Sequence, residues 1–176
     1  MLDYFYKSDY HLFPEEIRLE LREHALLNAS FWRNGNEDVG YDGNDVTMFQ
    51  STRIKVIDDL VRNCQLSTQT VLIKHPPNRD VVRHVDGLQW PRNTVIGIPL
   101  TVGKHTDTYF WESFDSVEPA AIVTYENTLP VVLNTTKFHS LVNDTDLDRL
   151  TLQFEFRQPI EEVVSYLKAR TLFKLL

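Results

Sequence analysis

The spacing of hydrophobic residues divides the chain into a helical first part, a long β-rich part and a final helix. In residues 14–29, PEEIRLELREHALLNA, apolar residues recur four apart, as they do on one face of a helix. Residues 51–64, STRIKVIDDLVRNC, show a similar pattern and predict a second helix. The Gly-, Asn- and Asp-rich residues 33–50 predict a loop, one that could lie over a site. The apolar stripe of the first helix consists of Ile17, Leu21 and Ala25.

From residue 69 the pattern changes to short runs of β-branched and aromatic residues separated by turn residues. Eight short strands in about 90 residues are typical of a β-sandwich or barrel. Pro99 interrupts the third run, which predicts that this strand lies at a sheet edge or carries a bulge. The eight predicted strands are QTVLIKH, VVRHVD, NTVIGIPLTV, DTYFW, AAIVTYE, PVVLN, KFHSLV and RLTLQFEF.

The chain is expected to form one domain of 176 residues, long enough to bury a core. Helices and a loop occupy 1–68, the β-rich core 69–157 and an amphipathic helix 158–176. The apolar side of that helix consists of Val163, Val164 and Leu167. The chain ends in LFKLL, which suits either a dimer contact or packing on the core, so the oligomeric state stays open.

Composition narrows the function classes. The net charge is −7 and the pI is near 5.3, which argues against a protein that grips a nucleic-acid backbone. Cys64 is the single cysteine, so no intrachain disulfide can form and a reducing compartment is expected. The N-terminus lacks the basic start and apolar run of a signal peptide, and no apolar stretch approaches the ~20 residues of a membrane helix. A cytoplasmic protein without a membrane partner is the prediction.

The most specific chemistry lies in the β-rich part, in VVRHVDG and KFHSLVNDTDLDRLTLQFEF. His84 and Asp86 are two residues apart and therefore share one face of a strand. His139 follows on a distant strand that a β-sandwich can bring close. Two histidines and one carboxylate on one face of an octahedral metal suit ferrous iron and leave three positions open. These residues therefore predict an iron site.

The strand RLTLQFEF contains the clearest alternation in the chain. Arg149 and Thr151 lie on its polar face, with Gln153 and Glu155. Arginine offers a planar fork for a carboxylate, and the hydroxyl of Thr151 can donate to the same group. As an isolated residue, Arg149 would equally fit a surface ion pair with Asp146 or Asp148.

Each of these signals has a less specific explanation. A second His-X-Asp, at His105 and Asp107, lies in a polar stretch typical of a solvated turn, 34 residues before His139. On their own, His84 and Asp86 would also suit a surface histidine and a turn aspartate before Gly87. The acidic run Asp144–Asp148 resembles a calcium loop in spacing, but Arg149 stands where such a loop needs glycine, so calcium is rejected.

Taken together, His-X-Asp, a distal His and an Arg ten residues further resemble the 2-oxoglutarate and Fe(II)-dependent oxygenases, over about residues 70–157. The segment from His139 to Thr151 is similar to the last two core strands of that family. The closest subgroup is the small prolyl- or aspartyl/asparaginyl-hydroxylase-like members. The resemblance implies a mainly β fold with flanking α-helices, a double-stranded β-helix, or cupin-like jelly roll.

The resemblance also implies roles for particular residues. His84, Asp86 and His139 would bind Fe(II), and Arg149, assisted by Thr151, would pair with the distal carboxylate of the co-substrate 2-oxoglutarate. With O₂, the implied reaction yields succinate and CO₂ and hydroxylates a C–H bond of a small molecule or protein side chain. The short chain favours a small or exposed substrate.

Arg92 and Trp90, in DGLQWPRNTV, are candidate substrate contacts. Arg92 would face a substrate carboxylate or else lie on the surface, whereas Trp90 and Trp111 would line the pocket or pack the core. Two other function classes stay open: a cupin-like metalloprotein that binds iron without 2-oxoglutarate, and a non-catalytic binding module on the same fold. The residues of a carboxylate clamp argue against the first, and an intact metal triad argues against the second.

Overall fold

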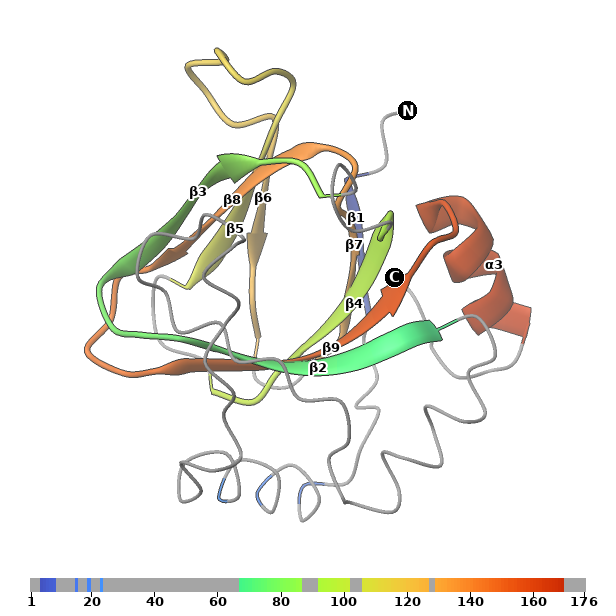
Figure 1. Cartoon of the computed structure of the whole chain (residues 1–176), viewed down its shortest axis with the longest axis horizontal. Helices are drawn as coiled ribbons and strands as arrows, with labels where there is room; N and C mark the ends of the chain where they lie inside the picture. The colour runs from blue at the N-terminus through green and yellow to red at the C-terminus, as the bar shows by residue number, and fades with distance from the viewer. Residues whose placement is uncertain are drawn as a thin grey trace.

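Two antiparallel β-sheets face each other across a common interior (Figure 1). The computed structural model describes residues 4–8, 15, 19, 23, 67–86, 92–101, 106–126 and 129–169. One sheet has the strand order β1-β7-β4-β9-β2 and the other has the order β3-β8-β5-β6. The strands are β1 (Phe5–Lys7), β2 (Ser67–His75), β3 (Arg79–His84), β4 (Thr94–Pro99), β5 (Asp107–Trp111), β6 (Ala121–Thr124), β7 (Val131–Asn134), β8 (Phe138–Asn143) and β9 (Arg149–Phe156).

From β2 to β9 the chain alternates between the two sheets, except at β5 and β6, which pair with each other within the four-stranded sheet. This is the topology of a double-stranded β-helix, or jelly roll. The predicted fold class is confirmed, and each of the eight predicted strands is present. β1, which the sequence did not predict, extends the larger sheet by pairing with β7.

The predicted edge position of the strand with Pro99 is wrong. β4 lies inside the five-stranded sheet, between β7 and β9. Its pairing with β7 ends at Gly97, whereas its pairing with β9 continues to Pro99, the last residue of the strand. Proline is tolerated here because it stands beyond the ladder to β7, where the loss of a backbone N–H breaks no interior pair.

The register of β3 against β8 changes by one residue just before the predicted iron ligands. Val81 pairs with Leu141, and His84 pairs with His139. Two β3 residues, 82 and 83, therefore lie opposite one β8 residue, which is a β-bulge. Residues three apart normally point to opposite faces of a strand, but the bulge turns His84 to the same face as Val81.

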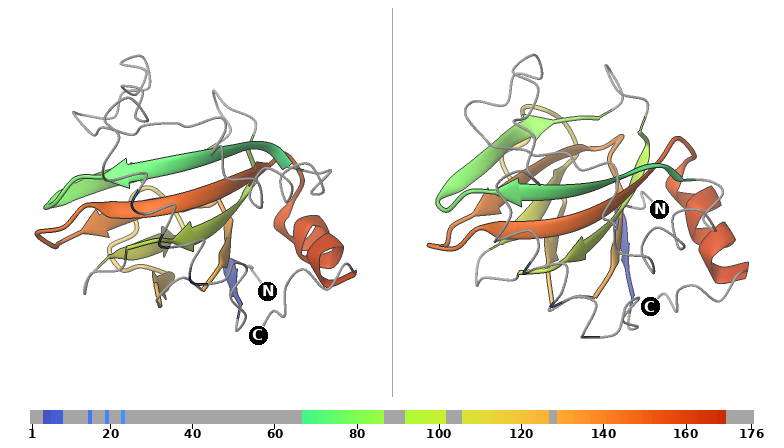
Figure 2. Two further views of the ribbon diagram at one scale, coloured as in Figure 1. Left: turned by 90° about the horizontal axis from the view of Figure 1, so that it is seen from below. Right: turned by 60° about the horizontal axis from the view of Figure 1, so that its bottom comes forward.

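Both faces of the larger sheet are covered. In β9, the residues Leu150, Leu152, Phe154 and Phe156 are at most 2% exposed, and most of the opposite face is buried as well. Phe110 of β5 forms the centre of an interior cluster with Val123, Tyr125, Val131 and Leu133. Figure 2 shows α3 (Ile160–Ala169) beside the five-stranded sheet. It buries the predicted Val163, Val164 and Leu167.

Part of the helical prediction for residues 14–29 is visible. Glu15, Leu19 and Glu23 are helical and exposed, and residues four apart share one helix face. They form a solvent-facing side of the predicted helix.

Among the described residues, no helix is long and apolar enough to cross a membrane. Outside the described residues lie the predicted loop 33–50, the predicted helix 51–64, Trp90, His105 and the terminal LFKLL.

Leu152 is expected to make a large contribution to stability because its side chain is fully buried in a strand with neighbours on both sides. Leu152→Ala should lower the free energy of unfolding by ~2–5 kcal/mol, through lost burial and the cavity left behind. Leu147→Ala is the control, since Leu147 is 59% exposed, and should change it by less than ~0.5 kcal/mol. Denaturant unfolding measures both, and similar losses would contradict this account.

Candidate metal centre and the polar interior

His84, Asp86 and His139 converge at one end of the four-stranded sheet. His84 ends β3, Asp86 lies in the bend that follows, and His139 is the second residue of β8. The ligand atoms of the three side chains lie within 4.8 Å of one another. Nε2 of His84 is 3.5 Å from Oδ1 of Asp86, and Nε2 of His139 is 3.9 Å from Oδ2. Three donors this close can bind a single metal ion.

The structure reaches this arrangement differently from the predicted strand. β3 ends at His84, so Asp86 is brought to the histidines by the bend and not by strand alternation. The backbone N–H of Asp86 donates to the carbonyl oxygen of Thr135 at 2.9 Å, which holds the bend against the end of β7. The bulge in β3 determines the face of the sheet to which His84 points.

Backbone carbonyls orient both imidazole rings. Nδ1 of His84 lies 2.8 Å from the carbonyl oxygen of Val82, and Nδ1 of His139 lies 2.9 Å from that of Lys137. A carbonyl oxygen only accepts, so each ring carries a proton on Nδ1, and Nε2 is the atom through which each would bind a metal. Both Nε2 atoms are near Asp86. Imidazole ligands of protein metals are commonly held in this way.

The protonation states suit a cation. Burial, together with the neighbouring His84, lowers the pKa of His139 from 6.5 to about 4. Burial alone would raise the pKa of Asp86, but a hydrogen bond with His84 and the charges of Arg92 and His139 outweigh it and hold that pKa well below its usual range. At neutral pH the group therefore presents a neutral buried imidazole and an ionised carboxylate, the forms that bind metals.

Arg92 lies between two carboxylates. Its Nε and Nη2 donate to Oδ2 and Oδ1 of Asp86 at 2.8 and 3.0 Å, and its Nη1 donates to Oε1 of Glu155 at 2.5 Å. Of the two positions expected for Arg92, the surface position does not fit its partial burial, and a contact with a substrate stays a prediction. Its guanidinium is occupied by two acids of the chain, and its side chain is only 20% exposed. Glu155 was not singled out, because its partner is 63 residues away.

A row of polar side chains continues from this cluster along the inward face of β9. Arg149 and Thr151 are 3% and 1% exposed, so the surface ion pair considered for Arg149 is excluded. Buried polar atoms nearly always have hydrogen-bond partners, and leaving one without costs ~1–3 kcal/mol. On and beside this row, four buried atoms lack a hydrogen-bond partner among the described residues: Nδ1 of His75, Nη1 of Arg149, Oγ1 of Thr151 and Oε1 of Gln153.

The side chain of Arg149 is buried against an aromatic ring. Its guanidinium carbon lies 4.4 Å from the centre of the Tyr125 ring, and the hydroxyl of Tyr125 is 2.8 Å from Oγ1 of Thr108. Burial lowers the pKa of Arg149, and Tyr125 counteracts this. Arginine nonetheless remains protonated in proteins. A buried cation with an unpaired Nη1, next to an unpaired hydroxyl on Thr151, fits a carboxylate ligand.

His75 adjoins this region and was given no role by the sequence. It pairs with Arg149 in the β2–β9 ladder. Burial and the charge of Arg149 lower the pKa of His75 from 6.5 to about 3, so the ring is neutral at pH 7. Alternation in the last strand identified Arg149 and Thr151. His75 ends its own strand, and only the cross-strand register reveals that it faces Arg149.

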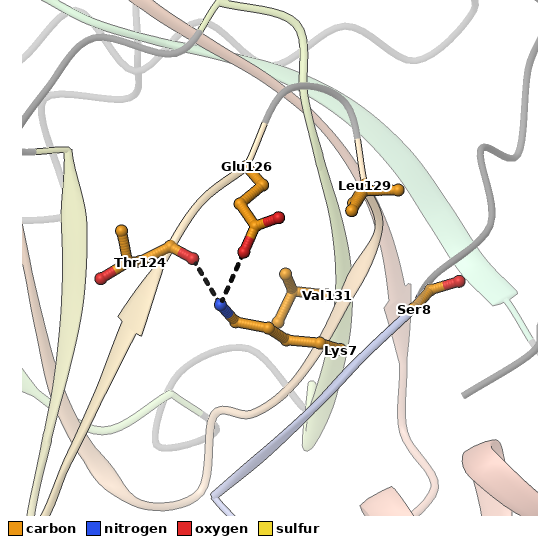
Figure 3. A pocket seen from close by; sticks show the side chains of 6 residues that line it. All are labelled: Lys7, Ser8, Thr124, Glu126, Leu129 and Val131. Carbon is orange, nitrogen blue, oxygen red and sulfur yellow. Dashed lines mark hydrogen bonds and ion pairs between the residues drawn. The ribbon is translucent and has the colours of Figure 1, made fainter. Parts of the chain in front are cut away.

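Other parts of the described structure are not organised for this chemistry. A hollow beside β1 is lined by Lys7, Ser8, Thr124, Glu126, Leu129 and Val131 (Figure 3). Nζ of Lys7 already donates to the carbonyl oxygen of Thr124 at 2.8 Å and lies 3.8 Å from Glu126. Trp111, a candidate for the pocket or core, instead carries the guanidinium of Arg83 on its ring at 3.5 Å.

No protein-family model matches the chain, and no curated protein matches it. Solved structures do. A prolyl-4-hydroxylase from Pseudomonas putida has a TM-score of 0.59 at 16% identity, covering 87% of this chain and 92% of that one. A prolyl hydroxylase from Trichoplax adhaerens, in complex with a hypoxia-inducible-factor peptide, has a TM-score of 0.63 at 10% identity, covering 92% and 87%. A non-haem α-ketoglutarate-dependent carbocyclase of nogalamycin biosynthesis has a TM-score of 0.59 at 13% identity, covering 86% and 78%.

These likenesses show the fold. The chain has the double-stranded β-helix fold of these solved structures, the fold that the sequence resemblance implied. The fold also contains a group of two histidines and an aspartate able to hold a metal ion.

Acidification is expected to destabilise the metal-free protein partly through His75. Its folded pKa of about 3 lies below 6.5, so the unfolded state takes up the proton first and stability falls as pH drops below 6.5. At pH 5 the loss in the free energy of unfolding that is due to His75 is about 2 kcal/mol. Urea unfolding of wild type and His75→Gln between pH 7 and 5 measures it. The variant should lose less stability, since only His139 and other shared groups remain, and an equal loss in both proteins would contradict the assignment.

Proposed function

We propose that this chain is a non-haem Fe(II)- and 2-oxoglutarate-dependent oxygenase. The observation that carries the proposal is the pairing of two features in one jelly roll. His84, Asp86 and His139 form a group able to hold a metal ion, and Arg149 and Thr151 present unpaired buried donors on the interior face of β9.

The donor set fits ferrous iron. Two imidazoles and one carboxylate match the three protein ligands of non-haem Fe(II) oxygenases, and they leave coordination positions for a co-substrate and O₂. His84 and His139 would bind through Nε2, because a backbone carbonyl accepts from Nδ1 of each ring. Asp86 would bind as an ionised carboxylate.

The interior face fits a dicarboxylate co-substrate. Arg149 would pair with the far carboxylate of 2-oxoglutarate, with the hydroxyl of Thr151 as a second donor. The row of inward residues on β9 runs from Arg149 to Glu155, and Glu155 joins Asp86 through Arg92. The clamp and the metal ligands thus belong to one connected polar interior.

Bound Fe(II), with 2-oxoglutarate and O₂, would supply oxidative decarboxylation to succinate and CO₂ coupled to oxidation of a substrate C–H bond. The protein's own part is binding and orientation. Arg149 and Thr151 would fix one end of the co-substrate, the two histidines and Asp86 would fix the metal, and the apolar cluster around Phe110 would limit water in the interior.

The substrate class proposed is a small molecule or a protein side chain. One structural neighbour is a prolyl hydroxylase with a bound peptide, and another is a carbocyclase. A cupin-like protein that binds iron alone is less well supported, because such a protein has no use for the buried donors of Arg149 and Thr151.

His84→Ala and His139→Ala are each expected to abolish stoichiometric Fe(II) binding under anaerobic conditions, because each removes one of three ligands. His105→Ala is the matched control, since it removes the histidine of the second His-X-Asp and should leave binding intact. Metal content after desalting gives the result. Full iron retention by both ligand variants would refute the assignment of the site. Loss of iron by His105→Ala would instead assign the site to the second His-X-Asp.

Arg149→Gln is expected to retain Fe(II) and to weaken 2-oxoglutarate binding by ~10²-fold or more, as expected when a charge-assisted bidentate contact is lost. The weak visible charge-transfer band of Fe(II)-chelated 2-oxoglutarate, titrated without O₂, measures it. Arg79→Gln removes an exposed arginine of β3 and serves as control. Unchanged affinity in Arg149→Gln would favour a different clamp, and absence of the band in wild type would favour the metalloprotein without 2-oxoglutarate.

A further inference from the structure

We propose that Arg92 and Glu155 act together as a positioning pair that holds Asp86 in the orientation required to bind the metal. This inference rests on the proposed function and extends it to two residues that do not bind the metal. Arg92, which leads into β4, contacts both oxygens of Asp86, and Glu155 contacts Arg92 from the neighbouring strand β9.

The bidentate contact fixes the plane of the Asp86 carboxylate. Both Asp86 oxygens accept from Arg92, at 2.8 and 3.0 Å, while Oδ1 is 3.5 Å from His84 and Oδ2 is 3.9 Å from His139. Each carboxylate oxygen has two lone-pair directions. One direction can therefore be used by Arg92 and the other left for a metal between the histidines. Without Arg92, the Asp86 carboxylate would lose the contact that fixes its plane and would rotate more freely.

Glu155 keeps Arg92 in place. It is 3% exposed and accepts from Nη1, while Nε and Nη2 are used by Asp86. The guanidinium is thus engaged on both edges and cannot turn to another partner without breaking its contacts with two buried carboxylates, which is costly. The backbone adds to this. Thr135 donates from Oγ1 to the carbonyl oxygen of Arg92 at 3.3 Å, and its own carbonyl accepts from the N–H of Asp86.

The charges show why two residues are needed. A guanidinium beside a metal ligand repels the incoming cation, and Glu155 supplies the opposite charge next to it. Together they orient Asp86 while contributing no net charge to the site. Removing both together therefore alters the orientation of Asp86 and leaves the net charge unchanged, which separates positioning from simple electrostatics.

Two variants test the inference. Arg92→Lys keeps the positive charge but loses the planar fork, so it cannot reproduce the bidentate contact. The double variant Arg92→Met with Glu155→Gln removes both charges. The probe is the metal alone, Fe(II) without O₂ and Co(II) in parallel, titrated into the full chain by calorimetry. Melting temperatures of the metal-free proteins are measured alongside.

Both variants are expected to bind metal 10–100-fold more weakly than wild type, the usual effect of losing a partner that orients a ligand. Wild-type metal affinity in both folded variants would overturn the inference, even if their melting temperatures fall, because the pair would then be purely structural. If the double variant fails to fold, Arg92→Lys decides the question alone. If wild type binds neither metal, the proposed function falls and the inference with it, so the two failures are distinguishable.

Discussion

The pairing of β3 with β8 is the constraint on which the candidate metal centre depends. These strands bring His84 opposite His139, and they do so only because the ladder slips by one residue at positions 82 and 83. At the same bulge, Val82 is exposed and the guanidinium of Arg83 lies over the ring of Trp111. The inward face thereby gains the imidazole of His84, while the two residues of the bulge, one more than the partner strand has, are accommodated outside.

A second constraint is the polar interior. Jelly-roll strands usually bury apolar side chains, yet here β9 turns Arg149, Thr151, Gln153 and Glu155 inward. Burying ionised groups is unfavourable unless they are paired. Glu155 meets this condition through Arg92, whereas Arg149 retains an unpaired Nη1 supported by the ring of Tyr125. Around Arg92 the charges of the interior are paired with one another, whereas around Arg149 buried polar atoms are left without hydrogen-bond partners among the described residues.

Much of this could be predicted from the sequence, because strand alternation and ligand spacing are local. Alternation identified the strands, the inward face of β9 and the buried face of α3. The edge position assigned to Pro99 failed because strand order is set by long-range pairing, and Pro99 merely ends a central strand. Arg92, Glu155 and His75 depend on partners across sheets or ladders, so no local pattern reveals them. The role of Trp90 stays a prediction.

The bulge also has a meaning for how such a site can change over generations. The direction of His84 depends on the number of residues between Val81 and His84, more than on which residues they are. Val82 is 72% exposed, so its identity is lightly constrained. Gain of a single codon there, with the bulge unchanged, would move the histidine one place past His139 and turn it outward, although every ligand would remain in the gene. In this protein, the number of residues at one exposed position is therefore an inherited determinant of where His84 points.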